Sequence, residues 1–200
     1  MLGGVKRSGA GAVAALLAPA WGLAADVPLP AFDCAGILGS QASHAALARH
    51  FGPRNVVFAT VPAAEGTTAQ ATVLFRGDRE RRAEIEWRDM ARRRAPASVT
   101  VGEGSRWQTP EGIGVGARLE EVEAANGGPF ILAGFGWDYA GTVYDWEGGR
   151  LARTGCRLIL RFEPAAGMGE GLDGDRDFRS DSPAMRAARP VVREMLLLWD

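Results

Sequence analysis

Lysine and histidine are nearly missing from this chain, and several familiar kinds of active site are excluded with them. Lys6 is the only lysine in 200 residues, and His44 and His50 are the only histidines. A phosphate-binding loop that depends on a lysine is therefore excluded beyond the N-terminus. The histidines stand six positions apart, so they would face different sides of a helix, and neither has a cysteine or acid at ligand spacing. We expect no catalytic residue, no metal and no cofactor.

The chain also lacks a hydrophobic run long enough to span a membrane. Residues 9–17 are apolar and uncharged, follow the basic pair Lys6 and Arg7, and precede small residues that extend to Ala25. This order is typical of a secretory signal peptide, and the apolar part is shorter than the roughly 20 residues of a spanning helix. We predict a signal peptide over residues 1–25 and a periplasmic or secreted protein. The alternative is a buried N-terminal helix.

Neither sign of charge dominates the composition, which has 23 basic and 24 acidic residues. Removal of the predicted signal peptide would take Lys6 and Arg7, leaving 21 basic residues (23 − 2) and a net charge of about −3 (21 − 24). A mildly acidic protein offers no broad positive field for phosphate groups, so nucleic acid is excluded as a partner. A protein or a component of the cell envelope is the partner that we expect.

Cysteine is scarce, with only Cys34 and Cys156 in the sequence. An even number of cysteines in an exported protein favours a disulfide, because the compartment is oxidising. Such a bond would join the start of the mature chain to a late strand and would add up to roughly 4 kcal/mol to the free energy of unfolding. Two buried free thiols are the alternative.

Hydrophobic periodicity predicts short helices and many strands, separated by glycine and proline. The first half begins with a helix over residues 43–51, capped by a serine and ended by Gly52. The second half begins with a helix over residues 118–126, and a helical turn is expected over 183–189. The predicted strands cover residues 56–61, 67–75, 81–88, 97–101, 129–133, 142–147, 157–162 and 191–199. We expect a hairpin around Gly148-Gly149 and a mobile Gly/Asp-rich loop over 165–182.

The two halves of the chain share landmarks when the first is shifted by 75 positions. Gly52 then falls on Gly127, and Gly66-Thr67 falls on Gly141-Thr142. The alternating apolar residues after Arg81 fall on those after Arg157. One offset that fits a helix, a stop, a loop and a strand indicates a duplicated unit. We predict an α+β fold of two tandem helix-plus-antiparallel-sheet units, the first over residues 26–110 and the second over 111–200.

The segment Gly112-Ile113-Gly114-Val115-Gly116, the helix after it and Asn126-Gly127-Gly128-Pro129 carry a resemblance. They are similar to β-lactamase-inhibitor-protein-like domains and to small outer-membrane-assembly lipoproteins, both exported bacterial proteins. The chain also resembles an uncharacterised exported bacterial family with a GFGWDY-like segment. The resemblance implies the tandem fold and an inhibitor-like or binding role. A lipid-attachment cysteine is missing, and so is a cysteine pair inside each repeat, so the fold is better supported than any activity.

Aromatic residues crowd one stretch of twelve residues in the second half. Glycines interrupt this stretch, which favours a loop with partly exposed rings over a continuous strand. We predict a binding or inhibitor-like module, not an enzyme, which acts through a sheet face and the GFGWDY loop. The alternative for these rings is core packing. The candidate binding residues are Phe135, Trp137, Asp138, Tyr139, Tyr144 and Trp146.

Two further readings compete with the binding module. An envelope hydrolase could use Asp138 and Asp145 as paired carboxylates, although nothing in the sequence sets their separation. A purely structural envelope protein is the third reading.

Four aspartates between 173 and 181 have the odd spacing of a calcium loop. Phe178 replaces the required glycine and Ala184 the bidentate acid, so a solvated loop is expected there.

Overall fold

The computed structural model describes Met1 and residues 28–63, 66–137, 139–164 and 171–200. Apart from Met1, the predicted signal peptide lies outside the described residues. The helices are α1 (His44–Phe51), α2 (Leu119–Asn126) and α3 (Pro183–Ala188), with 3-10 turns η1 (Gly36–Leu38) and η2 (Pro53–Asn55). The strands are β1 (Val56–Pro62), β2 (Thr68–Leu74), β3 (Ala83–Asp89), β4 (Arg94–Val101), β5 (Ile131–Ala133), β6 (Val143–Asp145), β7 (Arg157–Pro164), β8 (Asp177–Arg179) and β9 (Pro190–Leu198).

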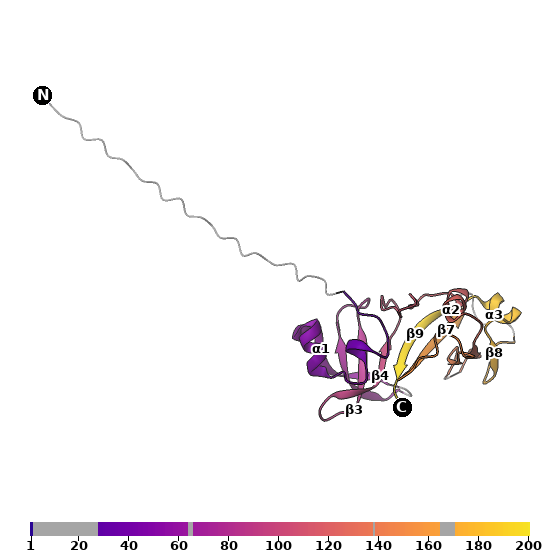
Figure 1. Ribbon diagram of the computed structural model, residues 1–200, viewed down its shortest axis with the longest axis horizontal. Helices are drawn as coiled ribbons and strands as arrows, with labels where there is room; N and C mark the ends of the chain where they lie inside the picture. The colour runs from indigo at the N-terminus through magenta and orange to yellow at the C-terminus, as the bar shows by residue number, and fades with distance from the viewer. Residues whose placement is uncertain (2–27, 64–65, 138, 165–170) are drawn as a thin grey trace.

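These strands form two antiparallel sheets, which confirms the α+β class. A six-stranded sheet has the order β1-β2-β3-β4-β9-β7, and a three-stranded sheet has the order β6-β5-β8. Figure 1 shows α1 beside one end of the molecule and α2 with α3 beside the other, while β9 and β7 run between them. None of the described helices is long and apolar enough to cross a membrane.

The two tandem units meet inside the larger sheet. Each starts with a helix, and α2 begins and ends 75 positions after α1 (119 − 44 and 126 − 51). The first unit continues as β1 to β4, and the second as β5, β6, β7 and finally β9. The last strands of the two units, β4 and β9, pair with each other. The units therefore share one sheet and one continuous hydrophobic core.

The predicted offset fits the helices better than the strands. Ile85 and Leu160 both lie on the core face of their strands, as the offset requires. In β5 the parity slips by one residue: Leu132 is buried, whereas Val57, its counterpart by the offset, faces away from the main core. A one-residue slip turns every side chain of a strand to the other face, so the offset does not hold for the buried face of β5.

Two further local predictions were wrong. The strand over 142–147 does not form a hairpin with the strand that follows, because β6 pairs with β5 and β7 pairs with β9. Part of the Gly/Asp-rich segment, predicted as a mobile loop, forms β8 against β5. Residues 165–170 of that segment lie outside the described residues. Backbone groups at the outer edge of β5 required a partner, and β8 supplies it.

Helix α1 illustrates how local sequence determines structure here. The Oγ atom of Ser43 accepts a hydrogen bond from the backbone N–H of Ala46 at 3.2 Å, as expected for an N-cap. Gly52 ends the helix with φ of 87°, a value that favours glycine. Leu47 and Phe51 are buried on the same helix face. Loss of one such side chain costs about 2–5 kcal/mol of stability.

The start of the described chain is fastened to the second unit. Cys34 and Cys156 form a disulfide with an S–S distance of 1.99 Å, which confirms the predicted bond. Next to it, the guanidinium of Arg153 lies 3.6 Å from the carboxylate of Asp33. Phe32 is fully buried among the core residues. A covalent bond, an ion pair and core packing thus hold this segment at the beginning of β7.

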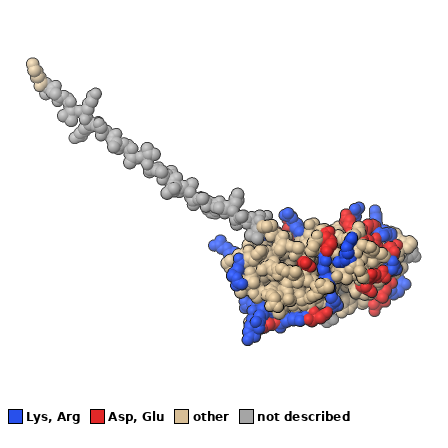
Figure 2. Space-filling model, viewed as in Figure 1, with Lys and Arg blue, Asp and Glu red and all other residues tan. Residues whose placement is uncertain are grey.

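Charged side chains lie on the surface around this core (Figure 2). Along residues 76–94 they form ion pairs. Arg82 pairs with Glu84, and Asp89 accepts from Arg94 at 2.9 Å and from Arg92 at 3.2 Å. Exposed pairs of this kind contribute about 0–1 kcal/mol each and keep the face solvated.

Candidate functional site

The two sheets approach each other at β6 and β7 and then separate. They meet at the bridge between Thr142 and Arg161, where the N–H of Phe162 donates to the carbonyl of Gly141 at 2.9 Å. Gly141 has φ of 66°, and a Cβ atom there would overlap the carbonyl of Phe162. Only glycine fits this close approach. Beyond the bridge no ladder joins the two strands in the described part of the chain, so a gap opens between their edges.

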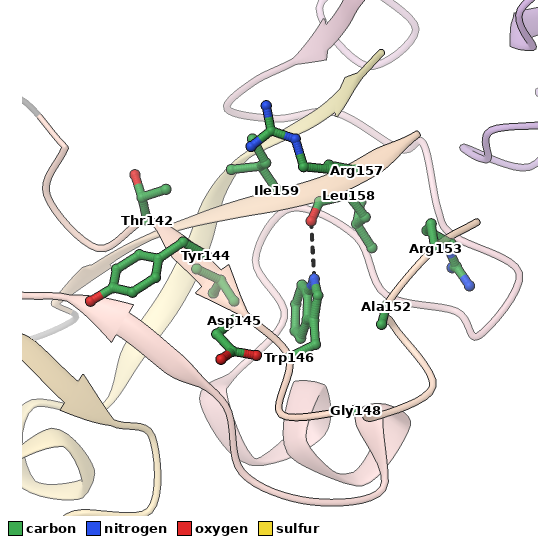
Figure 3. Close-up of a pocket in the computed structure, with 11 residues that line it drawn as sticks. Thr142, Tyr144, Asp145, Trp146, Gly148, Ala152, Arg153, Arg157, Leu158 and Ile159 are labelled. Carbon is green, nitrogen blue, oxygen red and sulfur yellow. Dashed lines mark hydrogen bonds between the residues drawn. The ribbon is translucent and has the colours of Figure 1, made fainter. Parts of the chain in front are cut away.

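A cavity of about 360 Å³ occupies this gap. It lies between β6, the turn that follows it, and β7, as Figure 3 shows. Its volume is at the lower end of the range for small-ligand pockets, which is about 300–1,000 Å³. The lining residues are Thr142, Val143, Tyr144, Asp145, Trp146, Gly148, Ala152, Arg153, Arg157, Leu158 and Ile159.

Trp146 forms the inner wall of the cavity. Its indole N–H donates to the carbonyl of Leu158 at 3.1 Å, the dashed line in Figure 3. The indole therefore satisfies a carbonyl of β7 that a neighbouring strand would otherwise bind. Trp146 is 8% exposed, and its ring lies 5.3 Å from that of Phe130. The wall is thus a fixed part of the core.

The buried amide of Asn126 fixes the turn after Trp146. Its Nδ2 donates to the carbonyl of Trp146 at 3.1 Å, and its Oδ1 accepts from the N–H of Leu151 at 3.2 Å. A Cβ at Gly149 would overlap this amide, which explains the glycine at that position. The turn is therefore held by the end of α2, and the cavity is preformed.

Polar side chains surround the mouth of the cavity. Tyr144 is 51% exposed, and Figure 3 shows its ring directed away from Trp146. Partial burial, followed by a hydrogen bond to the carboxylate of Asp177 and by the charges of Asp177 and Asp175, raises the pKa of the Tyr144 phenol. Its hydroxyl is therefore already bound by the protein. Arg157 lines the cavity from β7 and forms an exposed ion pair with Asp200 at 3.0 Å.

Arg153 also lines the cavity, but its guanidinium is already bound to the carboxylate of Glu111. Its Nη1 donates to Glu111 at 2.7 Å, and its side chain is only 12% exposed. The hydrogen bond from Arg153 lowers the pKa of Glu111 to about 2. The same hydrogen bond raises the pKa of Arg153. We therefore assign Arg153 to the structure of the wall rather than to ligand binding.

The structure divides the predicted binding residues into three groups. Phe135 is 2% exposed and packs in the core, so it does not belong to a surface. Trp137 is half-buried, donates to the carbonyl of Gly134 at 3.1 Å, and contacts Tyr139 with a ring distance of 5.4 Å. Tyr139 is 59% exposed. Tyr144 and Trp146 line the cavity, and Asp138 lies outside the described residues.

The sequence analysis did not identify the residues that β7 contributes to the site. Arg157, Leu158 and Ile159 belong to a strand that was predicted correctly, but that strand was expected to continue the sheet beside β6. The only sequence signal was the apolar Ile159 between two arginines on the outer face of the strand. A gap between two strands follows from pairing, which the periodicity of one strand does not show.

Asp145 and His44, which the sequence offered as candidates for catalysis, each bind another group of the protein. Asp145 accepts the backbone N–H of Glu147 at 2.7 Å. His44 Nδ1 lies 2.9 Å from the hydroxyl of buried Thr72, and burial, followed by the charge of Arg93, lowers its pKa. Among the described residues, no group of three or more histidine, cysteine or acidic side chains could hold a metal ion.

The chain matches no protein-family model, no curated protein and no solved structure. The resemblance to β-lactamase-inhibitor-like domains therefore stays a prediction, and the functional argument rests on the cavity itself.

Proposed function

We propose that this protein is an exported, periplasmic or secreted binding module that holds one aromatic or large aliphatic side chain of a partner protein in the cavity between β6 and β7. The single observation that carries the proposal is the open cavity with Trp146 as its inner wall. The disulfide and the predicted signal peptide support export.

The chemistry of the lining favours an apolar guest. Val143, Trp146 and Leu158 present carbon surface, and the indole N–H of Trp146 is bound to the carbonyl of Leu158. A guest side chain packed on these three residues would lose contact with water without breaking that hydrogen bond. Burial of an aromatic or aliphatic side chain contributes about 1.5–3 kcal/mol. Aromatic anchors in preformed pockets are the usual hot spots of protein interfaces.

The rim favours a guest that is part of a polypeptide. Arg157 lines the cavity and offers guanidinium donors at its rim. A main-chain carbonyl beside a guest side chain would accept from Arg157. Arg157 is available for this because its ion pair with Asp200 is exposed and therefore weak.

The test is a selection of phage-displayed random peptides on the immobilised protein, followed by calorimetry with the selected peptides. Ala152 is exposed at the cavity wall, so Ala152→Trp fills the mouth, while Ala184→Trp places the same ring on exposed α3. We expect selected peptides to share an aromatic or large aliphatic residue. Their affinity for Ala152→Trp should fall about tenfold or more, because a hot spot of about 1.4 kcal/mol is lost.

Three outcomes would contradict this function. The selection yields no binding peptide, selected peptides bind Ala152→Trp as tightly as Ala184→Trp, or alanine in place of the shared peptide residue leaves affinity unchanged. Thermal unfolding of both variants is the control for folding.

A further inference from the structure

The outer edge of β1 is the longest unpaired strand edge in the described part of the molecule. β1 pairs with β2 over all seven of its residues and with no other described strand. The ladder ends with hydrogen bonds from Phe75 N–H to the carbonyl of Asn55 and from Ala63 N–H to that of Thr67. Odd-numbered residues of this strand thus face β2, and the backbone groups of Val56, Phe58 and Thr60 face outward.

Apart from the proline at its last residue, this edge has none of the charges or bulges that normally prevent strands from associating. β1 has the sequence VVFATVP, without a charged residue, and no bulge interrupts its register. The three-residue edge strands β6 and β8 both carry charges, namely Asp145, Asp177 and Arg179. At the end of the larger sheet, β7 carries Arg157 and Arg161, and the indole of Trp146 binds its edge. A long uncharged edge is a template for another strand.

The second unit shows that the corresponding edge accepts an antiparallel strand. Like β1, β5 follows the helix of its unit and forms an antiparallel hairpin with the next strand. The outer edge of β5 is occupied by β8, with Leu132 opposite Phe178. The first unit has no such strand among the described residues. We propose that β1 of a second copy of this chain fills the position, so that two six-stranded sheets join across a two-fold axis.

The sequence of β1 fits this occupant. In an antiparallel pair centred on Ala59, all seven residues find a partner, and Ala59 lies opposite its own copy. Phe58 and Thr60 then form hydrogen-bonded pairs through their outward groups. Pro62 lies opposite Val56 and accepts from its N–H, while the carbonyl of Val56 at the end of the ladder receives no bond from proline, which has no N–H. Two identical strands without charged residues approach without repulsion between their own side chains. This inference does not depend on the cavity.

The test is sedimentation of the purified chain over a range of concentrations. We expect a monomer–dimer equilibrium with a dissociation constant between about 10 µM and 1 mM, because one strand pair buries less than a standard interface. Hydrogen exchange of the Val56, Phe58 and Thr60 amides should slow as the concentration rises. A monomer throughout this range, or a dimer that leaves these amides unprotected, would overturn the proposal.

Matched variants locate the contact. Thr60→Pro removes an outward N–H and leaves the bonds to β2, and Thr60→Lys adds a charge at the edge. Gln70→Lys is the control, because Gln70 is the cross-strand partner of Thr60 and lies one strand inside the sheet. Both changes at residue 60 should abolish dimerisation, while Gln70→Lys should keep it. Dimerisation of either variant at residue 60 with wild-type affinity would refute the model, and circular dichroism establishes that each variant folds.

Discussion

The two halves of this molecule begin alike and end differently. Helix, first strand, second strand and third strand follow at similar positions in both. In the first half, β1 to β4 form a continuous ladder with strands of seven or eight residues. In the second half, β5 and β6 have three residues each, and β7 leaves them to pair with β9. The comparison teaches that the cavity arises where the second half stops following the first.

The glycine and aromatic residues between 134 and 146 explain the difference. Gly141 brings β6 against β7 at one point, and Trp146 then binds the edge of β7 in place of a strand. The first half has neither a close glycine contact nor an indole at the corresponding position, and its hairpin continues. The first two of the following predictions test whether this segment separates the two sheets.

The largest effect is expected from Trp146→Ala. Trp146 is buried, contacts Phe130 and binds Leu158, so its loss should lower the free energy of unfolding by about 3–5 kcal/mol. Trp137→Ala, on a half-buried ring of the same segment, should cost less than half of that. Urea denaturation measures both. Equal losses would show that the two indoles have the same role.

The next effect is expected from Gly141→Ala, compared with Gly66→Ala at the corresponding position of the first half. Both glycines have positive φ, 66° and 70°, so alanine costs about 1–2 kcal/mol at either site. A Cβ at residue 141 also overlaps the carbonyl of Phe162, whereas the space around Gly66 is open. We expect a total loss of about 3 kcal/mol or more at 141. Thermal unfolding with similar losses for both variants would refute the close contact.

The smallest effect concerns acid and the pair of Glu111 with Arg153, which lies within the second half. The folded-state pKa of Glu111 is lowered to about 2 from 4.5, so its stabilisation is present above pH 4.5 and is lost as the pH falls toward 2. After allowance for solvent screening, this amounts to roughly 1 kcal/mol. Relative to Glu111→Gln, the wild type should lose this amount between pH 5 and pH 2, as urea unfolding measures. Glu103→Gln, at an exposed ion pair, is the control. Parallel pH profiles for wild type and Glu111→Gln would contradict the assignment.

Much of the fold could be predicted because its signals are local. The Ser43 cap, the Gly52 stop and the alternation along β3 and β7 each act within a few residues, and each predicted element exists in the structure. The disulfide could be predicted from the number of cysteines and the predicted export. The predicted hairpin after Gly148-Gly149 was wrong because the pairing of β7 depends on β9, which lies about 30 residues further along the chain.

The candidate site could be predicted only in part for the same reason. Tyr144 and Trp146 were identified from their aromatic side chains, but which rings are buried depends on strand parity and on the bridge at Thr142. Phe135 was assigned to the surface and lies in the core. The residues of β7 had no signal of their own as cavity residues.

The sequence by itself determined the α+β class, the order of the helices and of every strand except β8, and the paired cysteines, because periodicity, caps and counts act along the chain. Tertiary structure alone decided that β9 enters between β4 and β7, that β8 covers β5, and that β6 and β7 separate around Trp146. These outcomes depend on which distant backbone groups satisfy each other's hydrogen bonds, and on a shared core that buries both units at once.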